Sequence, residues 1–86
     1  MSPYKIFLRL EAAEAIRVVR GVQQTQISAF IDSLGNDPSQ VGDYTERDES
    51  DRQIEIKVIG QYAITFWADH AVKEIKIADI RRADRG

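Results

Sequence analysis

The stretch that most limits how this chain can fold is residues 52–80, "RQIEIKVIGQYAITFWADHAVKEIKIADI". In residues 53–58, Ile or Val alternates with Gln, Glu or Lys, the period of two that is typical of a β-strand. Gly60-Gln61 then places a glycine at the first central position of a two-residue hairpin, as a type II′ turn requires. Two further apolar runs follow, divided by a turn at or beside Asp69-His70. The stretch therefore predicts three consecutive antiparallel strands.

The N-terminal half predicts one strand followed by two helices. "YKIFLRL" alternates in part and favours a strand, whereas in "EAAEAIRVVR" the apolar residues recur at spacings of three and four, as on one face of a helix. We expect Gly21 to break this helix and Thr25 to cap a second one. The second helix would end at Gly35, since Asn36, Asp37 and Pro38 disfavour its continuation.

These elements predict an α+β domain over residues 1–86, with the order β-α-α-β-β-β. A single, mostly antiparallel sheet of about four strands would carry the two-helix hairpin on one face, because each helix has one apolar stripe to bury. In the first strand of the meander Ile54, Ile56 and Val58 form one face, and Gln53, Glu55 and Lys57 form the other. We expect the helices to leave uncovered a partly polar face that includes Glu55, Lys57 and Thr65, and this open face is the natural binding surface.

Composition excludes several classes of site. The chain has no cysteine and one histidine, so it can form neither a disulfide nor a thiolate zinc site, and we predict no metal and no cofactor. No apolar run reaches the roughly 20 residues of a membrane span. "MSPYKIFLRL" lacks the features of a signal peptide, so we expect a cytoplasmic protein without membrane contact.

The formal charge of −2 hides an asymmetry along the chain. Residues 1–51 carry five Lys/Arg against nine Asp/Glu, whereas residues 52–86 carry seven against five. The acidic residues concentrate in "GDYTERDESD", which is either a solvated loop or a docking site for a basic partner. The C-terminal "IRRADRG" concentrates arginines, either as a solvated strand end with acidic neighbours or as an anion-binding site.

The run "RQIEIKVIGQYAITFWADHAVKEIKIADIRRADR", together with the two helices and "DSLGNDPSQVGDYTE", resembles the RelE/ParE superfamily of toxins from type II toxin–antitoxin systems, which includes plasmid stabilisation proteins. The shared features are an alternating strand, a glycine turn, an aromatic strand and a last strand that ends in an Arg pair. The resemblance implies a toxin that is neutralised by an antitoxin protein encoded by a neighbouring gene. One branch of the superfamily cleaves messenger RNA on the ribosome, and another poisons DNA gyrase.

If the chain is an mRNA endoribonuclease, the resemblance assigns catalysis to Arg81, Arg82 and Lys57, with Glu46 or Glu49 as the acid–base group. Cationic side chains would hold phosphate and stabilise the charge that grows during transesterification. The nucleic-acid-binding residues would be Arg52, Lys57, Arg81, Arg82 and Arg85.

Three positions depart from the nuclease pattern. Ala63 stands where many nuclease members carry an arginine, Glu55 stands where some carry a lysine, and no tyrosine follows the Arg pair. The alternative is therefore a non-catalytic protein of the same fold, either a gyrase inhibitor or an inactive homologue.

Two further residues have competing interpretations. Phe66 and Trp67 lie on opposite faces of one strand, so Trp67 is either partly buried, under a loop or in an interface such as that of a homodimer, or a base-stacking residue. His70 is either a solvated turn residue or a general acid.

Overall fold

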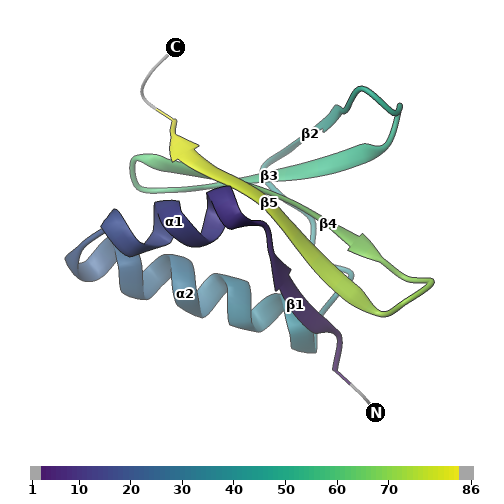
Figure 1. The fold of residues 1–86 in the computed structure, drawn as a ribbon, viewed down its shortest axis with the longest axis horizontal. Helices are drawn as coiled ribbons and strands as arrows, with labels where there is room; N and C mark the ends of the chain where they lie inside the picture. Colours follow the sequence, from purple (N-terminus) through teal and green to yellow (C-terminus); the bar gives the residue numbers. More distant parts are fainter. Residues whose placement is uncertain (1–2, 84–86) are drawn as a thin grey trace.

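The computed structural model of the protein describes residues 3–83. The elements in chain order are β1 (Lys5–Leu8), α1 (Leu10–Val18), α2 (Gly21–Asn36), β2 (Tyr44–Arg47), β3 (Gln53–Ile59), β4 (Tyr62–Asp69) and β5 (Glu74–Arg82). They form one five-stranded sheet in the order β1-β5-β4-β3-β2, in which β1 runs parallel to β5 and the other neighbours are antiparallel (Figure 1). The expected α+β architecture is confirmed, with one strand more than the sequence predicted.

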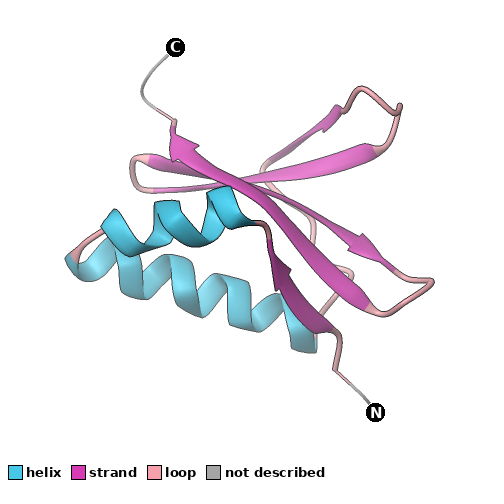
Figure 2. Ribbon diagram, in the orientation of Figure 1, coloured by secondary structure: helices cyan, strands magenta, loops and turns pink. Residues whose placement is uncertain are grey.

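Both helices lie on one side of the sheet, which gives the molecule two layers (Figure 2). The core between the layers is apolar, and no polar or charged residue within 3–83 is fully buried. Its buried residues are Ala12, Val19, Ile27, Ile31, Leu34, Ile64, Phe66, Ile75, Ile77 and Ile80. The buried core residues of the sheet thus come from its central strand, β4, and from the neighbouring strand β5.

The second helix is longer than predicted: it starts before Thr25 and ends after Gly35. It begins at Gly21, whose φ of 69° lies in the left-handed region, so the predicted helix break is the junction between α1 and α2. Thr25 lies inside the helix, where its hydroxyl donates to the Gly21 carbonyl at 3.4 Å, and it is not the N-cap. Gly35 belongs to the last turn of the helix, where a Cβ would lie 2.9 Å from the Tyr4 carbonyl oxygen.

The β3–β4 hairpin has the predicted turn. Gly60 has a φ of 58°, the left-handed conformation that a type II′ turn requires at its first central residue. Ile59 pairs with Tyr62 across this turn. The β4–β5 turn follows Asp69, and Lys73 adopts a positive φ of 58° there.

The predicted assignment of the faces of β3 is wrong. Lys57 pairs with Ile64, which is fully buried against the helices, and the Lys57 Nζ atom lies 5.9 Å from the Phe30 ring of α2. Lys57 and Glu55 therefore point to the helix side. Ile56 pairs with Thr65 on the opposite side, which no helix covers.

The twist of the sheet explains this reversal. Figure 1 shows β2 and the adjoining end of β3 projecting past the helix layer. The helix-side positions at this end of β3 lie beside the loop before β2, where polar side chains can be hydrated. The apolar residues Ile54, Ile56 and Val58 of β3 instead lie on the opposite side.

The strand that the sequence did not predict is β2, which lies in the acidic segment. All four of its residues are exposed, and it pairs with β3 from Tyr44↔Ile56 to Arg47↔Gln53. Backbone and carboxylate hydrogen bonds hold the start of this strand. The Asp43 amide donates to the Ile56 carbonyl at 2.8 Å, and the Asp43 carboxylate accepts from the Val58 amide at 2.7 Å.

Candidate functional site

The side of the sheet that the helices leave uncovered, here called the open face, is the first candidate site. Its centre is a hollow of about 160 Å³ between β2, β3, β4 and β5. The hollow is lined by Tyr44, Glu46, Ile54, Ile56, Ala63, Thr65 and Arg81. Most of this lining is uncharged, and the Tyr44 side chain on its rim is 49% exposed. Such a surface suits contact with a largely apolar partner.

The cation in this hollow is already paired. Arg81 donates from Nε to the Asp79 carboxylate at 2.7 Å, and its Nη2 atom lies at the same distance from that oxygen. Ala63 pairs with Arg81 on the neighbouring strand, so the position where the resemblance to a nuclease implies an arginine lies beside the last-strand arginine. A phosphate bound here would have to compete with Asp79 for the guanidinium.

The residues assigned to catalysis do not come together. Arg81 and Glu46 lie on the open face and line the same hollow. Lys57 and Arg82 point to the helix side, where Lys57 forms an ion pair with Asp43 at 3.6 Å and the Arg82 guanidinium carbon lies 5.7 Å from the Tyr62 ring centre.

The alternative acid–base candidate, Glu49, belongs to the exposed turn between β2 and β3 and does not line the hollow. The predicted nucleic-acid-binding residue Arg85 lies outside the described residues.

A row of alternating cations and aromatic rings crosses the open face. The Arg52 guanidinium carbon lies 4.0 Å from the centre of the Trp67 ring, and the Lys76 Nζ atom lies 4.6 Å from that of Phe7. Trp67 and Lys76 are paired across β4 and β5, which joins the two contacts into one row. Sequence reasoning identified Arg52 and Trp67 and missed Phe7 and Lys76, because the parallel β1–β5 pairing that brings Phe7 there is long-range.

His70 contributes to structure at the start of the β4–β5 turn. Its Nδ1 atom lies 2.8 Å from the Tyr4 hydroxyl, which ties the segment before β1 to this turn. Within residues 3–83 no cluster of His, Asp or Glu could hold a metal ion. None of the described helices is long and apolar enough to cross a membrane.

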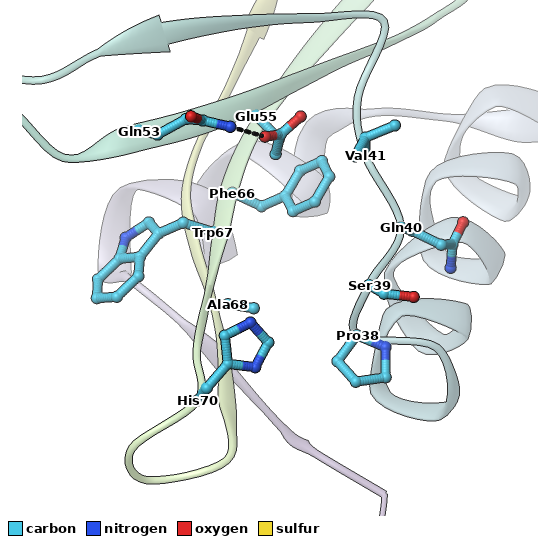
Figure 3. A pocket seen from close by; sticks show the side chains of 10 residues that line it. All are labelled: Pro38, Ser39, Gln40, Val41, Gln53, Glu55, Phe66, Trp67, Ala68 and His70. Atoms are coloured by element: carbon cyan, nitrogen blue, oxygen red, sulfur yellow. Dashed lines mark hydrogen bonds between the residues drawn. The ribbon is translucent and has the colours of Figure 1, made fainter.

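A second hollow, of about 350 Å³, lies on the helix side between the loop before β2 and strands β3 and β4. We call it the loop hollow. Its lining residues, drawn in Figure 3, are Pro38, Ser39, Gln40, Val41, Gln53, Glu55, Phe66, Trp67, Ala68 and His70. Figure 3 shows Phe66 pointing toward the loop and the Trp67 ring pointing away from it, so the two aromatics serve different faces as predicted.

Comparison with solved structures identifies the architecture. A chain of the archaeal RelE–RelB complex from Pyrococcus horikoshii OT3 superimposes with a TM-score of 0.79 and 16% identity, over 98% of this chain and 99% of that one. The fold is that of the RelE toxins. The isolated E. coli RelE toxin matches with a TM-score of 0.77 and 12% identity, over 96% of this chain and 87% of that one.

A chain of the RelBE2 toxin–antitoxin complex from Mycobacterium tuberculosis has the same RelE fold. It matches with a TM-score of 0.74 and 17% identity, over 93% of this chain and 98% of that one. No protein-family model matches the sequence, and no curated protein is significantly similar to it. The resemblance predicted from the order of the elements is therefore confirmed at the level of the fold.

Proposed function

We propose that this chain is the toxin component of a type II toxin–antitoxin pair and that a neighbouring gene encodes the antitoxin that neutralises it. The observation that carries this proposal is the RelE fold over nearly the whole length of both chains. Two of the matching structures are complexes with an antitoxin partner, which supports a protein partner for this chain as well.

The open face favours a toxin that acts by binding a macromolecular target without cleaving RNA. Phosphoryl chemistry needs several cationic side chains aimed at one point. Here the hollow contains Arg81, which is paired with Asp79, beside Ala63 and two isoleucines. Lys57 and Arg82 point to the other side of the sheet. A target protein such as DNA gyrase fits this surface better than messenger RNA on the ribosome does.

The test is to induce the gene alone and together with the adjacent reading frame, while growth, messenger RNA ends and DNA breaks are recorded. We expect growth arrest that the neighbouring gene relieves, with messenger RNA intact. Tyr44→Ala removes the exposed aromatic of the open face and should relieve the arrest, whereas Val18→Ala, at an exposed position on α1, should not.

Two outcomes would contradict the proposal at different levels. Codon-linked messenger RNA cleavage that is lost in Arg81→Ala would show a nuclease and reject the binding mechanism. Normal growth on induction, with the folded protein present in the cell, would reject the toxin function itself.

A further inference from the structure

We propose that the loop hollow is a binding site for a lysine or arginine side chain from a separate polypeptide. The site lies on the helix side of the sheet, away from the open face, so it does not depend on the function proposed above. The proposal combines the shape of the hollow, its charge and the residues on its rim.

The hollow has the shape that a long cationic side chain needs. The apolar groups of Phe66, Ala68 and Pro38 form its walls, and the Glu55 carboxylate lies at one end (Figure 3). Lysine and arginine combine an apolar stem with a charged head, so the stem can pack on the apolar walls while the head meets the carboxylate. Glu55 is the one acidic residue in the lining.

The Glu55 carboxylate is held in place before any ligand binds. Its Oε1 atom accepts from the Gly42 amide at 2.8 Å, and its Oε2 atom accepts from the Gln53 side chain at 3.1 Å. A carboxylate has about four acceptor positions, so it can accept further donors from a ligand. Lys57, two residues along the same side of β3, is paired with Asp43 and leaves Glu55 without an ion-pair partner among the described residues.

The surroundings of the hollow add to its preference for a cation. Residues 37–51, which form the loop before β2, β2 itself and most of the turn after it, contain six Asp/Glu and one Arg. This acidic segment attracts a basic chain over a longer range than the hollow alone, and that attraction weakens as salt is added.

The rim indicates a polypeptide as the source of the cation. Val41, beside the hollow, is 70% exposed. Exposed apolar residues around a pocket are typical of protein interfaces, where they contact the backbone and neighbouring side chains of the bound segment.

The described C-terminal arginines of the same molecule do not supply this side chain. The Ala83 amide donates to the Gln61 carbonyl at 2.7 Å, so the end of β5 lies at the β3–β4 turn. His70 marks the opposite end of β4, where the loop hollow opens. The acidic surroundings of the hollow favour a basic segment of a partner protein as the source of the cation.

The test uses the ¹⁵N-labelled protein and a blocked pentapeptide, acetyl-Ala-Ala-Arg-Ala-Ala-amide, with the citrulline peptide as its uncharged control. We expect the arginine peptide to shift the amide signals of Gly42 and Ala68 in a saturable way, and the citrulline peptide to bind at least about tenfold more weakly. Glu55→Gln keeps the size of the side chain and its acceptor for the Gly42 amide, and it should weaken arginine-peptide binding by about tenfold. Glu46→Gln removes the same charge on the open face and should change it by no more than about twofold.

Several results would overturn the proposal. Equal shifts with the citrulline peptide would show that charge is not recognised. Equal weakening by Glu46→Gln and Glu55→Gln would show diffuse attraction to the acidic segment and no site. Shifts that appear at the same residues without peptide as protein concentration rises would identify a second copy of this chain as the occupant.

Discussion

At the scale of single residues, burial on one face of the sheet decides what an aromatic ring contributes. Phe66 is 2% exposed and packs edge-on against Phe30, with ring centres 5.5 Å apart, whereas Phe7 on the open face is 50% exposed. We expect Phe66→Ala to lower the free energy of unfolding by about 3–5 kcal/mol, since it leaves a cavity in the core. Phe7→Ala loses mainly its contact with Lys76 and should cost about 0.5–1 kcal/mol.

Urea denaturation of the two variants checks this pair, with the intact protein as reference. An equal loss of unfolding free energy in Phe66→Ala and Phe7→Ala would mean that the open face is covered in solution. The alternation along β4 predicts that Phe66 and Trp67 lie on opposite faces, but it cannot tell which of them meets the helices. Which ring meets the helices depends on which side of the sheet the helices cover. The sequence does not decide this, because both rings have comparable apolar surface to bury.

At the scale of elements, the loop before β2 fastens this edge strand to the sheet through a close backbone contact. A Cβ at Gly42 would lie 2.4 Å from the Ile56 carbonyl oxygen. Because that oxygen belongs to the backbone of β3, it cannot rotate away from the added methyl group as a side chain could. We therefore expect Gly42→Ala to lower the free energy of unfolding by about 1–3 kcal/mol. Faster hydrogen exchange at the Asp43 and Val58 amides would locate the damage at the junction of β2 and β3.

Ser39→Ala, in the same loop, is the matched control. The Ser39 side chain is exposed and donates to Asp37, so its loss should change stability by less than about 0.5 kcal/mol. Unchanged exchange in Gly42→Ala would contradict the tight packing described for this loop.

The elements with strong apolar patterns could be predicted from the sequence, and β2 could not. The helices and the β3–β4–β5 meander have periodic apolar residues and recognisable turns. β2 is short, acidic and fully exposed, and it owes its strand conformation to backbone pairing with β3. The face of β3 was predicted wrongly for a related reason: alternation separates apolar from polar positions, but the twist of the sheet decides which set the helix layer reaches.

The candidate site was predictable to the same extent. The Arg pair and Ala63 could be found from spacing, and the strand register then placed Ala63 beside Arg81. Alternation also separates Arg81 from Arg82, since adjacent strand residues point to opposite faces. The loop hollow could not be predicted, because it forms where the loop before β2 meets β3 and β4, which are distant in the sequence.

At the scale of the whole molecule, a one-sided helix layer leaves uncovered a sheet face on which apolar and aromatic residues lie among charged ones, and the isoelectric point is acidic, near 5.3. Near that pH the net charge no longer keeps copies apart, so the open face should drive self-association. Light scattering at pH 5.3 should give a mass above the 9.8 kDa of the monomer, which falls toward the monomer mass at pH 8 as negative charge accumulates.

Two lysine substitutions separate the open face from net charge as the cause of this association. Tyr44→Lys adds a cation to the open face, and Val18→Lys adds the same charge to α1, where Val18 is 72% exposed. With each variant measured at its own isoelectric point, we expect Tyr44→Lys to remain monomeric and Val18→Lys to associate as the unsubstituted chain does. A monomer mass for the unsubstituted chain over a wide concentration range would reject self-association. Equal loss of association in both variants would show that it does not run through the open face.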